Sequence, residues 1–520
     1  MPLRKAALAA ALISLIWTVL NLLIVRRCGL PQPAIHDEFS YLLAADTFVH
    51  GRLSNSPHPL AQFFESPHIL VRPTYASKYP PGQALVLALG ERLFGAPYYG
   101  VLIGGAVMIF LFALTLAAWT APVPAMGVSV LLALLFLPPM YWVYSYWGGC
   151  VAAAGGAALL LSFMVYRRDH TFAAGVLFAS GAVTLFLTRP YEGGVFTAVV
   201  VIVCAARLYR ERGRLALAGM RAFLLSAVPI AIAGMLWTGI YDRAVTGNPI
   251  RLPYMLHAAQ YNIAPVLWIL PLSPKHEYGN PRLAAQYEWD VGIYKSNRGG
   301  RFVVIRPFIS GFRSAFDTFG SGLLLLLLVP FAWRDWRVRL LAVVIGISVL
   351  GLGLEVFHFA HYAAPVTMAI ALLVACGAEA AWQFRMHSRP YGAILTCVVL
   401  AISCAFPLRA VLRTAREGTD HHNVGDQRAK VIADLSTLKR GQLVIVHYPD
   451  PLWNGKDEWV YNNADIDLQK VIFAHDLGMD KDAALLHYYR DRQIWLLTFE
   501  HGQYCLSPYP PGAVSGRTDR

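Results

Sequence analysis

The chain of 520 residues is 56% hydrophobic and only 14% charged, whereas a typical soluble domain carries roughly 25% charged residues. Together with a mean hydropathy of +0.47, this composition argues against a soluble protein and predicts one that crosses a membrane several times. The net charge of +13 would suggest nucleic acid as the partner of a soluble protein, but most basic residues here fall in short loops between apolar segments, where membrane topology explains them.

Apolar segments of spanning length follow one another along most of the chain. A spanning helix needs about 20 mainly apolar residues, and by this criterion we expect about eleven transmembrane helices. Their expected positions are 7–25, 98–118, 124–142, 149–166, 171–187, 192–208, 222–241, 319–333, 340–357, 363–383 and 390–408. The first follows Arg4 and Lys5 and has no small-residue cleavage site after it, so we interpret it as an uncleaved signal anchor.

The positions of the basic residues predict how these helices are oriented. Lysine and arginine concentrate in cytoplasmic loops, and the pattern fits best with a cytoplasmic N-terminus. Arg189 is then the one basic residue in the short outer loops. Three long segments lie outside, at about 28–97, 242–318 and 409–520. The apolar run 83–94 is too short to span and predicts an interfacial helix.

The composition changes sharply after residue 408, where charged residues return. The periodicity of the hydrophobic residues and the residue types predict helices at 425–440 and 480–490 and strands at 442–447 and 493–499. The predicted fold is therefore an all-α polytopic membrane domain over 1–408, followed by a small extracytoplasmic α/β domain over 409–520.

Several kinds of site are absent from the sequence. The seven cysteines show neither CxxC nor metal-ligand spacing, so no metal ligands are assigned. Cys28 and Cys505 would both lie outside, where spacing alone leaves a disulfide between them open. There is no Walker loop, dinucleotide fingerprint or GxSxG, so nothing points to ATP, NAD or a serine hydrolase.

Two adjacent acids, Asp37 and Glu38, directly follow the first predicted span. Carboxylates are costly near hydrocarbon and therefore indicate function there. A carboxylate at a partly dry interface can act as a general base, orient an acceptor or bind a metal. The equally weighted alternative is that Asp37 caps a helix beginning near Phe39.

A second polar cluster, Lys78-Tyr79-Pro80-Pro81-Gly82, lies in the same outer segment. The Pro-Pro-Gly sequence ends an extended segment and starts a helix. A lysine just outside the membrane suits the phosphate of a lipid. An ordinary interfacial Lys–Tyr anchor explains the pair equally well.

A third polar pair stands at an outer helix end, where Arg189 and Glu192 are three residues apart. They either pair with each other as a structural staple or Arg189 faces a reaction cavity. Because Arg189 is the only basic residue of the short outer loops, the sequence slightly favours the second interpretation.

Aromatic and histidine residues mark two further outer helix ends. Tyr146 and Trp147 lie in an aromatic turn, for which an interfacial belt is the usual explanation and stacking on a sugar the alternative. His358, His361 and Tyr362 form another cluster that could contact a phosphate or a metal. No further metal ligands can be placed there, so interfacial histidines are the preferred interpretation.

Taken together, these motifs resemble the membrane glycosyltransferases of the GT-C class. The resemblance is strongest to the bacterial relatives of dolichyl-phosphate-mannose protein mannosyltransferases and of lipid A aminoarabinose transferases. The matching stretches are HDEFSYLLAADTFVHGRL (36–53), KYPPGQALVLALG (78–90), SYWGG (145–149), TRPYEGG (188–194) and HFAHYAAP (358–365). The acidic stretch after a single N-terminal helix is the most specific of them.

The resemblance implies a multi-pass enzyme of the bacterial inner membrane with a periplasmic active site and a role in the cell envelope. It would transfer a sugar, with inversion, from a polyprenyl-phosphate donor to a lipid, glycan or protein acceptor. No cofactor is implied with certainty, although some relatives need a divalent metal. Nucleic acid is not an implied partner.

The resemblance also implies roles for individual residues. Asp37 would be the catalytic base with Glu38 beside it, and Lys78 would bind the donor phosphate. The weaker candidates for phosphate binding are Arg189 and His361. The residues expected to line the substrate site are Tyr79, Tyr146, Trp147, Glu192 and Tyr362.

The competing interpretation is a lipid or glycan transporter or flippase without transferase chemistry. Such proteins tend to carry charged residues in mid-span and broken helices in matching halves. Here the charges cluster at the outer helix ends and no internal repeat is visible, which favours the transferase.

Overall fold

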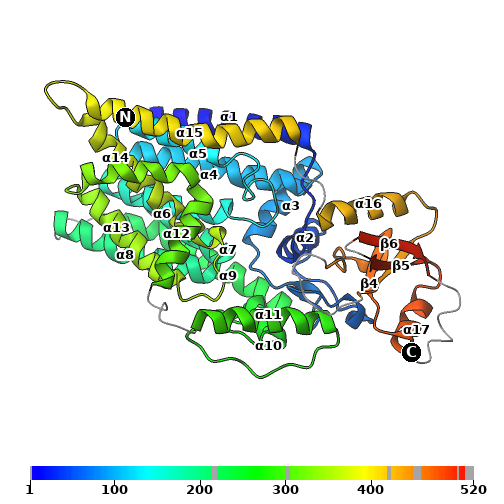
Figure 1. The fold of residues 1–520 in the computed structure, drawn as a ribbon. Helices are drawn as coiled ribbons and strands as arrows, with labels where there is room; N and C mark the ends of the chain where they lie inside the picture. Colours follow the sequence, from blue (N-terminus) through cyan, green and yellow to red (C-terminus); the bar gives the residue numbers. More distant parts are fainter. Residues whose placement is uncertain are drawn as a thin grey trace.

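The computed structural model of the chain describes residues 3–212, 219–298, 305–418, 423–448, 458–500 and 503–509. A bundle of long helices forms one side of the molecule, and a small sheet with its helices forms the other (Figure 1). The first long outer segment of the membrane part lies between them, and the second runs along the lower edge of the molecule in this view, each with its own short helices (Figure 1).

Nine helices of the described part are long and apolar enough to cross a membrane. They are α1 (Leu3–Cys28), α4 (Tyr98–Trp119), α6 (Cys150–Arg167), α7 (Thr171–Thr188), α8 (Pro190–Arg212), α9 (Met220–Thr246), α12 (Arg306–Phe319) with the 3-10 segment η3 (Gly320–Ala332), the 3-10 segment η4 (Ala360–Val366) with α14 (Thr367–Gln383), and α15 (Tyr391–Glu417). Each coincides with a predicted span, so the prediction of an all-α polytopic membrane domain is confirmed.

The other two predicted spans contain shorter helices. The span expected at 124–142 is α5 (Pro122–Leu135), and residues 136–149 form turns instead. Pro138 and Pro139 explain the early end, because proline lacks the N–H group that a helix needs and restricts the residue before it. The span expected at 340–357 is α13 (Trp336–Leu352).

Helix α6 lies at the centre of the bundle and is buried along nearly its whole length. It packs against α4, α7 and η4. Its small residues allow this close approach: a Cβ atom added at Gly156 would lie 2.1 Å from the carbonyl oxygen of Pro365 in η4. This packing fixes η4, and with it His361 and Tyr362, against the bundle.

The first outer segment folds into short elements that follow α1. They are α2 (His36–Val49), the 3-10 turn η1 (Ala61–Phe64), the strands β1 (Ile69–Leu70) and β2 (Ala76–Ser77), and α3 (Gly82–Phe94). Helix α3 coincides with the helix predicted at 83–94. The second outer segment contains α10 (Pro253–Tyr261) and α11 (Pro281–Arg298), neither of which was predicted.

The C-terminal part is a four-stranded sheet with two helices. In chain order it contains α16 (Val424–Ser436), β3 (Gln442–Val446), the 3-10 turn η5 (Ile466–Leu468), β4 (Val471–His475), α17 (Met479–Tyr488), β5 (Gln493–Glu500) and β6 (Gln503–Pro508). The strand order is β4-β3-β5-β6, with β3 parallel to both of its neighbours and β5 antiparallel to β6. The predicted helices and strands are present, and β4 and β6 were missed.

The C-terminal sheet and the first outer segment share one hydrophobic core. Phe39 of α2 stacks on Tyr461 with ring centres 4.2 Å apart. Arg52 forms a two-pronged ion pair with Asp465, at 2.8 and 2.6 Å. These contacts bring the C-terminal part against the helix that begins with the two acids.

Cys28 and Cys505 do not pair. All seven cysteines are free thiols. Cys28 is buried at the end of α1, where its thiol lies 3.5 Å from the carbonyl oxygen of Thr414 in α15, and Cys505 is exposed on β6. The disulfide that the sequence left open is therefore not formed.

Candidate active site

The two adjacent acids act differently because they occupy successive positions in the first turn of α2. One carboxylate oxygen of Glu38 accepts hydrogen bonds from the backbone N–H groups of Ala34 (2.9 Å) and Ile35 (3.2 Å), and the other accepts one from that of Tyr146 (2.8 Å). Glu38 is 3% exposed, and burial raises its pKa to about 7. Both oxygens are committed to the backbone, so Glu38 ties the 145–149 turn to the start of α2.

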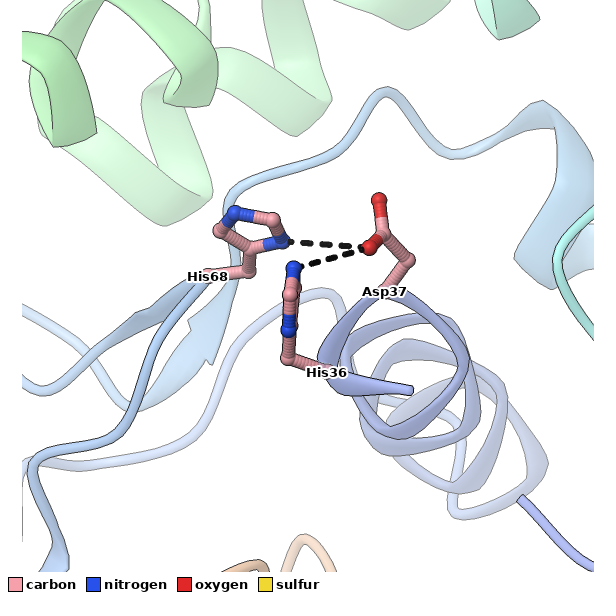
Figure 2. Close-up of side chains that lie close together, drawn as sticks. All are labelled: His36, Asp37 and His68. Atoms are coloured by element: carbon pink, nitrogen blue, oxygen red, sulfur yellow. Dashed lines mark ion pairs between the residues drawn. The ribbon is translucent and has the colours of Figure 1, made fainter. Parts of the chain in front are cut away.

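Asp37 faces a separate polar site. Its Oδ1 accepts a hydrogen bond from the Tyr79 hydroxyl, and its Oδ2 lies 3.2 Å from Nε2 of His36 and 3.6 Å from Nδ1 of His68 (Figure 2). The alternative in which Asp37 caps a helix beginning near residue 39 is wrong. Helix α2 already begins at His36, and Glu38 accepts the hydrogen bonds from the N–H groups ahead of it.

His68 reaches this site from the chain segment just before β1. Its φ of +66° places it in the left-handed region, and its carbonyl oxygen accepts hydrogen bonds from the Ser40 hydroxyl (2.7 Å) and the Lys78 N–H group (3.2 Å). Its ring stands edge-on to that of His36, with centres 4.2 Å apart, and its Nδ1 lies 2.9 Å from the Tyr79 hydroxyl. Burial lowers the pKa of both imidazoles, which keeps them neutral at neutral pH.

Lys78 is a buried cation next to the same tyrosine. It is 7% exposed, and its Nζ lies 5.1 Å from the ring centre of Tyr79 and 5.3 Å from that of Tyr254 on α10. No described residue forms an ion pair with it. Burial lowers its pKa to about 8, against the opposing charges of Asp37 and of Asp290 on α11. A buried ammonium between aromatic rings and without an ionic partner is suited to an anion brought by a ligand.

Arg189 and Glu192 form an ion pair with each other. Of the two roles that the sequence allowed for this pair, the structural one is therefore observed. They lie at the junction of α7 and α8, with Nη1 of Arg189 3.2 Å from Oε1 of Glu192. The guanidinium also lies 4.5 Å from the ring centre of Tyr362. Because Arg189 is committed to these partners while Lys78 has no ionic one, the geometry favours Lys78 as the ligand of an anion.

The remaining expected site residues pack within the wall of the bundle. The Tyr146 hydroxyl donates to the carbonyl oxygen of Pro31 (3.1 Å). The ring of Trp147 lies 4.7 Å from that of His361, and Nδ1 of His361 lies 3.0 Å from the Tyr141 hydroxyl. Among the described residues, no hydrogen bond joins Trp147 or His361 to Asp37. Arg189 lies near enough to Lys78 for its charge to lower the pKa of that ammonium. Tyr79 is therefore in direct contact with both Asp37 and Lys78, and Arg189 borders them.

The two imidazoles of the site are not among the site residues predicted from the sequence. His36 belongs to the acidic motif, but the sequence leaves open whether it tunes Asp37 or faces water, and nothing in the sequence singles out His68. The available signal was that both histidines lie in the segment that also contains Asp37 and Lys78. Their convergence depends on the turn that carries His68 back to α2, and no local sequence pattern specifies that turn.

Comparison with known proteins places this site on a known fold. No protein-family model and no curated protein matches the sequence. Among solved structures, ArnT from Cupriavidus metallidurans bound to undecaprenyl phosphate is 12% identical with a TM-score of 0.50, over 95% of this chain and 92% of ArnT. The Archaeoglobus fulgidus oligosaccharyltransferase tethered with an acceptor peptide is 13% identical with a TM-score of 0.51, over 95% of this chain and 68% of that one.

Both of these proteins belong to the GT-C class. At such low identity the likeness establishes the fold, and the fold agrees with the resemblance seen in the sequence motifs. The nine apolar helices and this likeness lead to one conclusion: the chain is a multi-pass membrane protein with the GT-C fold.

Proposed function

We propose that the protein is a membrane glycosyltransferase that takes a sugar from a polyprenyl-phosphate donor. The observation that carries the proposal is that Asp37 contacts the hydroxyl of Tyr79 and Lys78 lies over its ring, in one largely buried site outside the spanning helices. In a group transfer, a carboxylate so placed can take the proton of the acceptor, and an ammonium so placed can stabilise the charge of the leaving phosphate. ArnT, which shares the fold, has a structure with undecaprenyl phosphate bound, and this supports the donor class.

In the proposed reaction, an acceptor hydroxyl attacks the anomeric carbon of the donor sugar while Asp37 takes the hydroxyl proton. The bond from the anomeric carbon to the phosphate oxygen breaks, and the polyprenyl phosphate leaves with both electrons of that bond. Lys78 stabilises the charge on the phosphate, and Tyr79 orients the Asp37 carboxylate through its hydrogen bond. A single displacement of this kind inverts the anomeric configuration.

The surroundings of the site suggest where the substrates bind. Lys78 lies beside Tyr254 of α10, so the second outer segment would cover the donor phosphate. The C-terminal sheet packs on α2 through Phe39 and Tyr461, so this domain would border the acceptor. The acceptor is a lipid, glycan or protein on the outer face, which we assign to the periplasmic side of a bacterial inner membrane.

A panel of radiolabelled polyprenyl-phosphate sugars tests this proposal with the purified full-length protein and a membrane extract as the acceptor pool. The wild type and Glu91→Gln, which changes an acid on α3, should consume one donor and give a product of inverted configuration. Lys78→Ala should bind that donor more weakly. If the wild type consumes no donor but moves one intact across vesicles, the protein is a transporter and the proposal is wrong.

A further inference from the structure

Three side chains from two chain segments converge on one point of the outer site. His36 and Asp37 come from the first turn of α2, and His68 comes from the segment before β1 (Figure 2). One ligand atom from each lies within 4.8 Å of the other two. Among the described residues this is the one such group of three histidine, cysteine or acidic side chains.

The distances from Asp37 to the two imidazoles are close to the edges of a tetrahedral metal site. Zinc binds imidazole nitrogen at about 2.0–2.1 Å and carboxylate oxygen at about 2.0–2.2 Å, so two ligand atoms of a tetrahedral site lie about 3.3 Å apart. Oδ2 of Asp37 lies 3.2 Å from Nε2 of His36 and 3.6 Å from Nδ1 of His68. The second distance is too long for a hydrogen bond, yet it needs only a small adjustment to become an edge of a metal tetrahedron.

The protein holds these ligands in place before any ion arrives. The side chains of His36, Asp37 and His68 are only 12–15% exposed. The left-handed backbone of His68, with φ of +66°, is kept in place by two hydrogen bonds to its carbonyl oxygen, from Ser40 and Lys78. Strained backbone of this kind persists where the surrounding structure enforces it, which is common at functional sites.

The groups around the three ligands also affect how a metal ion would bind. The Tyr79 hydroxyl forms hydrogen bonds with both Oδ1 of Asp37 and Nδ1 of His68. An ion bound to Nδ1 of His68 would replace the second of these bonds, and the first would remain. The charge of Lys78 opposes a cation, and the carboxylates of Asp37 and Asp290 interact with Lys78 and offset it. The donor set of two imidazoles and one carboxylate selects zinc-like ions over magnesium or calcium, which prefer oxygen ligands.

We propose that His36, Asp37 and His68 form a binding site for one divalent transition-metal ion of the zinc and cobalt class. Three protein ligands leave a fourth position open to water. This inference goes beyond the proposed transferase function and does not depend on it, because binding of the ion requires neither donor nor acceptor.

Cobalt binding to the full-length protein tests the site. The protein in detergent is stripped with a chelator and dialysed against micromolar Co²⁺, and the bound metal and its visible absorption are measured without substrate. The wild type should bind one Co²⁺ per chain with the intense absorption bands of a tetrahedral ion. His68→Ala and His36→Ala should lose that ion, whereas His50→Ala, at an exposed position just after α2, should keep it.

Asp37→Asn retains the shape of the side chain. It therefore separates a loss of Co²⁺ binding caused by the missing ligand from a loss caused by misfolding. It should weaken Co²⁺ binding at least tenfold while its size-exclusion profile and thermal unfolding match the wild type. The proposal is overturned if the wild type binds no Co²⁺, or if the histidine variants bind it as the wild type does. Either outcome leaves the donor-turnover result untouched, so failure of the metal site and failure of the transferase function are separable.

Discussion

The hydroxyl of Tyr79 donates a hydrogen bond to the carboxylate of Asp37 and thereby joins the two motifs that the sequence presents 42 residues apart. The ring of Tyr79 also lies beside the ammonium of Lys78, 5.1 Å from its centre. One tyrosine therefore sets the position of both the proposed base and the proposed phosphate ligand. A substitution of Tyr79 therefore tests whether Asp37 and Lys78 function together.

Replacing Tyr79 with phenylalanine should slow transfer without preventing donor binding. A hydrogen bond to a charged group contributes about 1.5–3 kcal/mol, so loss of the bond that orients Asp37 should lower kcat by about 10- to 100-fold. The phenylalanine ring keeps the contact with Lys78, so the KM for the donor should change less than threefold. Steady-state kinetics separate the two effects, and a change confined to KM would refute an orienting role.

Donor affinity should fall as the pH rises above about 8. Burial lowers the pKa of Lys78 to about 8, so its ammonium is present below that pH and is lost above it. Where Lys78 is the phosphate ligand, the Kd of the donor should be flat between pH 6 and 7.5 and then rise by up to about tenfold per pH unit.

Lys78→Arg is the matched control for this prediction, because arginine keeps its charge throughout the range. Its donor Kd should be weaker overall but independent of pH up to about 10. Donor binding to the wild type that shows no dependence on pH, measured on vesicles at constant ionic strength, would rule out Lys78 as the phosphate ligand.

Glu38→Gln should affect stability rather than chemistry. Both carboxylate oxygens of Glu38 accept backbone hydrogen bonds, and glutamine offers only one acceptor oxygen. At least one buried N–H group is then left without its partner, at a cost of about 1–3 kcal/mol in the free energy of unfolding. The thermal midpoint should fall while kcat per folded molecule stays within about threefold of the wild type. A large loss of kcat with unchanged stability would instead make Glu38 part of the catalytic machinery.

The C-terminal domain should depend on Tyr461 far more than on its ion pair with the membrane part. Tyr461 is 5% exposed, and removing a buried aromatic side chain costs about 3–5 kcal/mol. The side chains of Arg52 and Asp465 are 36% and 32% exposed, and exposed ion pairs contribute up to about 1 kcal/mol. Hydrogen exchange of the β4 amides should therefore increase strongly in Tyr461→Ala and little in Arg52→Ala. Equal effects of the two variants would contradict this account of how the domain docks.

The parts of the fold that the sequence predicted are those with a strong local pattern. The nine spanning helices show in hydropathy because each must be apolar over a length set by the bilayer. The helices α10 and α11 lack that pattern: α11 carries charged and polar residues on all sides and is held by its neighbours. The span predicted for α5 extends seven residues beyond the end of the helix at Leu135. The residues stay hydrophobic past that point, while Pro138 and Pro139 end the helix.

The candidate site was predictable to a lesser degree. Asp37 and Lys78 stood out because charges at a membrane boundary are rare, and the structure brings both to Tyr79. Arg189 stood out for the same reason but pairs with Glu192, and sequence spacing alone allowed both outcomes. His68 could not have been foreseen, since its position depends on a left-handed turn held by Ser40 of another element.

The measurement that tests the central claim most directly is turnover of the polyprenyl-phosphate sugar by Asp37→Asn beside the wild type. Both proteins would be studied at saturating donor, with folding checked by thermal unfolding. Loss of a general base lowers the rate by about 10²–10⁴-fold, and the account predicts a loss of that size with donor binding preserved. Equal turnover by the two proteins would contradict it, and would place the reacting groups elsewhere in the molecule.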